Sequence, residues 1–162
     1  MNQTFVSRLG WVVGLCILAI GAHANVTLTT SVQKVVAVLD EQGQVVRRLE
    51  TVESVVPDDV LHYTITFTNE GVETVDAGSI VITNPLPEET EYLQGSAFGA
   101  GTDITFSVDG GSTFAEPEAL EVEREGGVQP AQPADYTTIR WVFKPALDPG
   151  QTGDVTFDVR LK

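Results

Sequence analysis

The chain has 162 residues, of which 9 are basic and 23 acidic, and its formal net charge is −14. One domain fits this length, and so acidic a surface is not expected to bind nucleic acid or anionic lipid, which need clustered cations. The chain has one cysteine, Cys16, near its N-terminus. A disulfide framework is therefore excluded.

Residues 1–24 have the pattern of a secretory signal peptide. Arg8 precedes an apolar run at 11–20, and an Ala-His-Ala sequence ending at Ala24 provides the small residues of a cleavage site. The apolar run is too short for a bilayer span, which needs about 20 residues. We therefore expect cleavage after Ala24 and an exported mature chain, 25–162, that is periplasmic or secreted.

Beyond residue 25 the chain alternates short β-type stretches with turns. The β-type stretches, in chain order, are 26–32, 34–40, 45–50, 61–68, 77–87, 103–109, 137–144 and 154–162. Turns are expected at 41–44, at Asp109-Gly110-Gly111 and at Pro149-Gly150. The segment 123–135 is rich in proline, glycine and charge, so we expect it to be a loop. No stretch has a helical period.

Seven to nine short alternating strands predict an all-β, immunoglobulin-like antiparallel β-sandwich that forms a single domain over 25–162. In each strand, every second residue should face the core. The expected core residues are Tyr63, Ile65, Phe67, Ile80, Ile82, Phe106, Trp141, Phe143, Val155, Phe157 and Val159.

His62 is the one histidine of the expected mature chain. It lies on the threonine-bearing face of the 61–68 stretch, opposite Tyr63 and Phe67, so we interpret it as a solvent-facing strand residue. A general base needs a positioned nucleophile, and a zinc site with a single histidine and no cysteine would be unusual. We expect no enzymatic activity, no catalytic residue and no cofactor-binding residue.

Acidic residues at predicted strand ends and turns are the candidates for a cation site. They are Asp58, Asp59, Asp103 and Asp109. Calcium is the ion that such positions favour, because it takes six to eight oxygen ligands from carboxylates, carbonyls and water. No Asp-x-Asp-x-Asp-Gly loop is present, so we predict no metal ligand and keep calcium as an alternative.

Several of these stretches resemble one known family. The run Tyr63–Gly71, "YTITFTNEG", is similar to a family strand that ends in Thr-Asn-x-Gly, and Pro57-Asp58-Asp59 stands where the family has a Pro-Gly-Asp lead. The segment 81–96 resembles the family's Leu-Pro segment, with Asn84 where Asp is usual. Pro149-Gly150 and the last strand match the end. The resemblance, strongest over 57–162, is to the bacterial Ig-like conserved repeat domains grouped as domain of unknown function number eleven.

The resemblance implies an exported Ig-like sandwich of the cell envelope, without catalytic residues. It also implies that Asn69 and Gly71 serve by adopting turn conformations. We therefore expect a structural or protein-binding module of the envelope, whose partner is an unknown envelope or surface protein. The alternative is a small carbohydrate- or calcium-binding accessory domain. Its candidate loop aromatics are Tyr92, Phe98, Phe114 and Tyr136.

Overall fold

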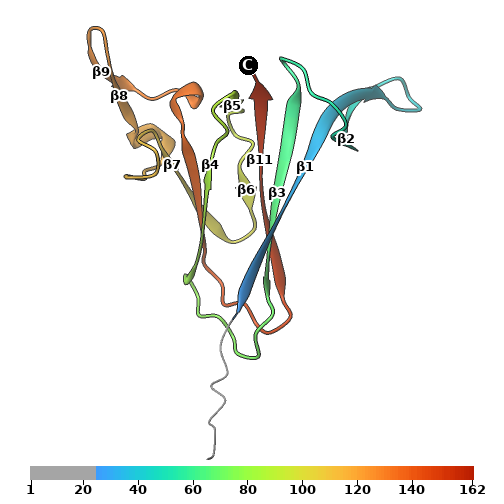
Figure 1. Ribbon diagram of the computed structural model, residues 1–162, viewed down its shortest axis with the longest axis vertical. Coiled ribbons are helices and arrows are strands. Elements are labelled where there is room, and N and C mark those ends of the chain that lie inside the picture. Colours follow the sequence, from blue (N-terminus) through green and yellow to red (C-terminus); the bar gives the residue numbers. More distant parts are fainter. Residues whose placement is uncertain (1–24) are drawn as a thin grey trace, which may run out of the picture.

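The computed structural model describes residues 25–162, and in these residues the chain is built from antiparallel β-sheets (Figure 1). The predicted signal peptide lies outside the described residues. The strands are β1 Val26–Leu39, β2 Val45–Thr51, β3 Val60–Asn69, β4 Ile80–Pro85, β5 Thr90–Tyr92, β6 Phe98–Gly99, β7 Thr102–Ser107, β8 Glu121–Arg124, β9 Gly127–Pro130, β10 Thr138–Phe143 and β11 Thr152–Leu161. Two short 3-10 turns, η1 Pro117–Ala119 and η2 Pro133–Asp135, complete the described structure.

Two sheets enclose the core. The larger has the order β2-β1-β3-β11-β5, with β6 also paired to β11, and the smaller has the order β4-β10-β7. The sheets face one another through side chains of both. The Trp141 ring of β10 lies 5.9 Å from the Phe157 ring of β11, and the Phe143 ring lies 5.0 Å from that of Phe67. The prediction of an all-β antiparallel fold is therefore confirmed.

The two-residue period identifies most of the core. Nine of the eleven expected core residues are buried, and the other two, Tyr63 and Phe143, pack against the core while partly exposed. Trp141, Phe157, Val155 and Val159 are completely buried. Alternation succeeds here because each central strand has one face against the opposite sheet.

The described residues contain more strands than the seven to nine expected. The excess comes from short strands that lack apolar alternation. The segment 123–135 is not a simple loop, because its first part belongs to the β8–β9 hairpin, in which Glu121 pairs with Pro130 and Arg124 with Gly127. Seven of the eight residues in these two strands are exposed, and each strand has a single valine, so no apolar alternation marks the pairing in the sequence.

Three of the expected turns are present. The 41–44 turn joins β1 to β2, and Gly110 and Gly111 both have positive φ in the turn after β7. At Pro149-Gly150, the Gln151 N–H donates to the Asp148 carbonyl at 3.0 Å, and Gly150 has φ 75°. Glycine takes this left-handed conformation without steric cost.

Asn69 and Gly71 lie at the expected turn, because the Gly71 N–H donates to the Asn69 side-chain oxygen at 3.0 Å where β3 ends. Neither residue has a positive φ, and Asn69 is in addition completely buried. Within the described chain, the single non-glycine residue with positive φ is Asp58, at 71°. It occupies the position at which the resembled family has glycine.

A long hairpin leaves the body of the larger sheet (Figure 1, right). Val35 is the last residue of β1 that pairs with β3, and the strand then continues with β2 as its single partner in the described chain. We call residues 36–51 the β1–β2 arm. All seven residues of β2 are exposed, so the arm gains little stability from the core.

Candidate functional site

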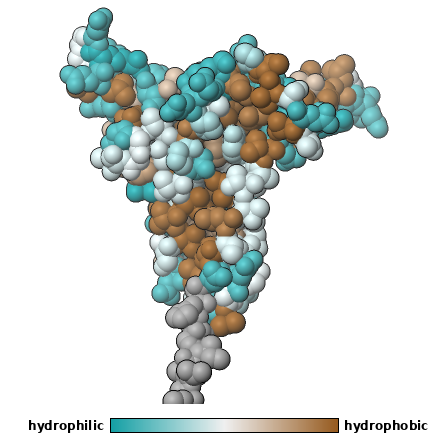
Figure 2. Space-filling view, in the orientation of Figure 1, coloured by the Kyte–Doolittle hydropathy of each residue, from teal (hydrophilic) through white to brown (hydrophobic). Residues whose placement is uncertain are grey.

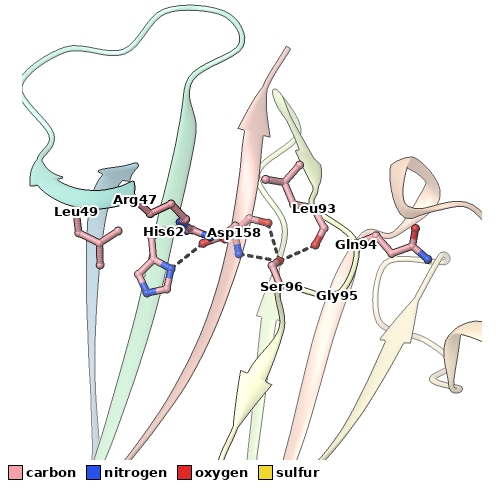
Figure 3. Close-up of a pocket in the computed structure, with 8 residues that line it drawn as sticks. All are labelled: Arg47, Leu49, His62, Leu93, Gln94, Gly95, Ser96 and Asp158. Carbon is pink, nitrogen blue, oxygen red and sulfur yellow. Dashed lines mark hydrogen bonds and ion pairs between the residues drawn. The ribbon is translucent and has the colours of Figure 1, made fainter. Parts of the chain in front are cut away.

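A hollow of about 690 Å³ lies on the outer face of the larger sheet (Figure 3). Strands β3 and β11 contribute its floor, the arm one wall, and the β5–β6 connection the other. The lining residues are Arg47, Leu49, His62, Leu93, Gln94, Gly95, Ser96 and Asp158.

Asp158 is the central residue of this hollow. It lies on β11 between the core residues Phe157 and Val159, so alternation turns its side chain to the outer face. Even so, the side chain is only 6% exposed. One carboxylate oxygen accepts from Arg47 Nη2 at 2.9 Å, and the other lies 2.6 Å from His62 Nδ1. A buried carboxylate needs such partners, because desolvation would otherwise disfavour its charge.

His62 lies on the predicted face but is not solvent-facing. Its side chain is 19% exposed and contacts Asp158 across the β3–β11 pairing, in which the two residues are directly opposite. An ionised carboxylate can only accept hydrogen bonds, so Nδ1 of His62 carries a proton in this contact. The interpretation of His62 as a solvent-facing strand residue is therefore wrong, because most of its side chain is covered.

An aspartate bound to histidine Nδ1 is the orienting half of a catalytic triad, so the position of the nucleophile decides what this site can do. The nearby serine is Ser96. Its hydroxyl donates to the Leu93 carbonyl at 2.6 Å and accepts from the Asp158 N–H at 3.0 Å. Figure 3 shows Ser96 on the side of Asp158 away from His62. The Ser96 hydroxyl is therefore hydrogen-bonded to backbone groups of Leu93 and Asp158 and not to His62. For this reason the described residues of the hollow form no catalytic triad.

The cluster of Arg47, His62 and Asp158 has a mechanical consequence. Arg47 belongs to β2 and Asp158 to β11, and the two strands are separated by β1 and β3 in the sheet. Their ion pair therefore holds the arm over the outer face and closes one wall of the hollow. Where β1 still pairs with β3, before the arm begins, Lys34 lies 2.6 Å from Asp59, the residue that precedes β3.

Replacing the central carboxylate tests this attachment. We expect Asp158→Asn to raise the hydrogen-exchange rate of the β2 amides that bond to β1, while core amides change much less. The expected cost is about 1 kcal/mol, because Arg47 keeps much of its exposure to water. Asp154→Asn is the matched control, since Asp154 lies on the same strand and face but pairs with Thr66. Equal exchange of β2 in the two variants would contradict the attachment.

The four calcium candidates are not brought together. Asp59 pairs with Lys34, and Asp103 pairs with Lys144 of the smaller sheet at 2.7 Å. Asp109 closes its own loop, and hydrogen bonds from the Ser107 hydroxyl and from Thr113 hold its pKa well below the usual value. Hydrogen bonds from Lys34 and the Val56 N–H likewise lower the pKa of Asp59. Asp59, Asp103 and Asp109 thus already have hydrogen-bonding or ion-pair partners within the protein. In residues 25–162, no group of three or more Asp, Glu, His or Cys side chains is arranged to hold a metal ion.

The aromatic candidates for carbohydrate stacking are divided. Tyr92 and Tyr136 are buried and form a ring cluster with Phe106, with centroids between 4.7 and 5.8 Å apart. A smaller hollow of about 330 Å³ lies beside this cluster. Phe114 lies under the Arg140 guanidinium at 4.0 Å, so Phe98, at 64% exposure, is the one ring of the four that is freely presented.

No family model, characterised protein or solved structure matches this chain. In residues 25–162, no helix is long and apolar enough to cross a membrane. Sequence reasoning placed His62 on the correct face but gave no role to Arg47 or Asp158. The position of Asp158 between the core residues Phe157 and Val159 was the one sequence signal for a buried carboxylate. It does not single out Asp158, because the charged residues Asp154 and Arg160 of the same strand are exposed.

Proposed function

We propose that this chain is an exported, non-enzymatic Ig-like module of the cell envelope, and that it binds another protein through the free edge of β2. The proposal rests on the form of the β1–β2 arm. A seven-residue strand is paired on one side alone in the described chain and is exposed on both faces. Unpaired strand edges are templates for pairing with another chain.

The side chains of the arm support the same conclusion. Leu39, Val45, Val46 and Leu49 are exposed by 69%, 72%, 38% and 40%. Figure 2 shows apolar surface on this part of the molecule (upper right). A two-stranded hairpin outside a core is marginally stable in water, so the Arg47–Asp158 pair that holds it is best understood as presenting the edge. The apolar side chains then supply contact area to a partner.

Other parts of the proposal rest on different observations. The N-terminal pattern supports export, and the two antiparallel sheets with a buried tryptophan support the Ig-like comparison. The occupied Ser96 hydroxyl supports a non-enzymatic role. The carbohydrate-binding alternative has less support, because two of its four aromatic candidates are buried in the ring cluster.

Site-specific photo-crosslinking in the native cells tests this function. We expect a photoreactive residue at Val45 on β2 to give a discrete protein adduct. The matched control is the same photoreactive residue at Val128 on the β8–β9 hairpin, which is 64% exposed, against 72% for Val45. Adducts that form equally from both positions, or from neither, would refute binding through the β2 edge.

A further inference from the structure

The pairing of the arm determines which backbone groups of β2 are free. At the turn, the Asp40 N–H donates to the Gln44 carbonyl at 2.9 Å, and the pairing continues with Leu39 opposite Val45 and Val38 opposite Val46. Antiparallel pairs alternate between hydrogen-bonded and non-hydrogen-bonded types. Val46, Arg48 and Glu50 therefore bond to β1. The residues whose N–H and C=O groups point outward are Val45, Arg47, Leu49 and Thr51.

The charges of β2 favour one way of pairing this edge with a copy of itself. In a twofold antiparallel pair, the residue at the axis lies opposite its own copy. With Leu49 at the axis, Arg48 lies opposite Glu50 of the second copy, and this attractive pair occurs twice. Centring the pair on Arg47, Arg48 or Glu50 instead places like charges opposite one another, which is destabilising. An axis at Leu49 also suits the backbone, because the N–H and C=O groups of Leu49 point away from β1 and are free to bond to the second copy.

We infer that the occupant of the β2 edge is a second copy of this chain, paired antiparallel about a twofold axis at Leu49. The inference rests on the proposed function and names its partner. The larger sheets of two copies join into one continuous sheet, and each β2 edge is covered by the other. The two Leu49 side chains, each 40% exposed in one copy, lie side by side on the face that carries Arg47. This is an isologous interface, the commonest kind in soluble homodimers.

The interface is small, so the dimer is expected to be in reversible equilibrium. A stable interface buries about 1,200–2,000 Å² in total with roughly 20–30 residues a side, and a strand of seven residues provides less than that. Each copy of residues 25–162 carries 8 basic and 23 acidic residues, and the copies repel one another at long range. Dimerisation should therefore be measured at about 0.15 M salt. At this ionic strength the repulsion between the copies is screened beyond roughly 8 Å, while the close contacts at the strand edge persist.

Charge reversal distinguishes this register from a non-specific association. In sedimentation velocity on residues 25–162, we expect wild type to show a concentration-dependent dimer. Arg48→Glu and Glu50→Arg should each weaken it on the order of tenfold, because both attractive pairs become repulsive. The double variant R48E/E50R, which keeps the net charge, should restore it. An equimolar mixture of the two single variants should form the heterodimer, in which acidic and basic edges meet.

The controls separate a failed fold from a failed interface. Glu123→Arg makes the same charge change as Glu50→Arg, on the exposed β8 strand away from the arm, and should leave the dimer unchanged. Urea unfolding followed by the fluorescence of Trp141 checks that each variant folds. A wild-type protein that stays monomeric, or a double variant as weak as the single ones, overturns the inference.

Disulfide trapping checks the same register by geometry. Residues 25–162 contain no cysteine, so single-cysteine variants react unambiguously. Arg48 and Glu50 of opposite copies form a non-hydrogen-bonded pair, with Cα atoms about 4.5 Å apart, which suits a disulfide. A mixture of Arg48→Cys and Glu50→Cys should give the mixed disulfide in preference to either homodimer. Equal amounts of all three products would reject this register.

The outcome also separates the inference from the proposed function. If the pure protein is monomeric but the intact-cell adduct at Val45 contains a different protein, binding through the β2 edge holds and the self-pairing is wrong. If neither a dimer nor an adduct forms, both are wrong. A dimer in solution together with an adduct of twice the chain mass supports both.

Discussion

Asn69→Asp is expected to destabilise the protein by about 3–5 kcal/mol at neutral pH, although it changes a single amide to a carboxylate. Asn69 is completely buried at the end of β3. Its Nδ2 donates to the carbonyls of Glu73 at 2.7 Å and Leu147 at 2.9 Å, and its Oδ1 accepts from the Gly71 N–H at 3.0 Å. A carboxylate oxygen in place of Nδ2 would oppose two carbonyl oxygens without a proton between them.

The pH dependence makes this expectation specific. Burial and the two carbonyls should hold the pKa of the introduced carboxyl above its value in the unfolded chain. The protonated form can donate to a carbonyl, so the stability lost at neutral pH should be partly regained as the pH falls through the folded-state pKa. Asn69→Ala is the control, with a cost of about 1–3 kcal/mol and no such titration.

Urea unfolding of residues 25–162, followed through Trp141, measures both variants between pH 4 and 7. Trp141 is completely buried and is the one tryptophan of this segment, so its emission reports on the core. Equal costs for Asn69→Asp and Asn69→Ala across this range would show that the amide donors are not what stabilises the site.

Gly153→Ala should destabilise the protein by about 1–3 kcal/mol, although alanine is the better residue for an extended strand by about 0.5–1 kcal/mol. Gly153 of β11 lies directly opposite Phe67 of β3. A Cβ at this position would overlap the Phe67 ring, with Cε2 at 2.8 Å and Cε1 at 3.0 Å. The ring is 1% exposed and packs against Phe143, so it has no free space into which to move.

A double-mutant cycle identifies the cause. Phe67→Leu removes the ring that the new methyl group would meet, so the double variant should lose less stability than the two single variants predict together. A coupling of about 0.5–3 kcal/mol is expected for residues in direct contact. Additive costs would show that Gly153 is required for another reason, such as the backbone of the strand.

The sequence predicts the central strands of this protein well and its edges poorly. Alternation along 61–68, 137–144 and 154–162 identified the central strands and most of the core, because each of these segments has one face against the opposite sheet. The arm is different. Its strand β2 was expected as β structure, but nothing in its residues showed that both faces would be exposed. The β8–β9 hairpin was missed, because each of its strands has a single valine and nearly all of its residues are exposed, so no apolar alternation marks the pairing.

The candidate site depends on long-range register, which the sequence pattern does not contain. His62 and Asp158 are 96 residues apart, and Arg47 and Asp158 are 111 apart. Each residue by itself looks like an ordinary charged or polar residue on the outer face of a strand. They meet because β11 pairs with β3 in one particular register and because the arm bends over the same face.

The sequence by itself determined that residues 25–162 form antiparallel β-structure, which side chains face the core, and where Pro149-Gly150 must turn. These follow from local physics: a two-residue period sorts side chains between faces, and proline and glycine restrict or permit particular φ angles. The tertiary structure alone decided that Asn69 is a buried hydrogen-bonding centre, that His62 is held by a buried aspartate, and that β2 is left with an open edge. Each of these depends on which distant strands become neighbours, and strand order is fixed by the packing of the whole chain.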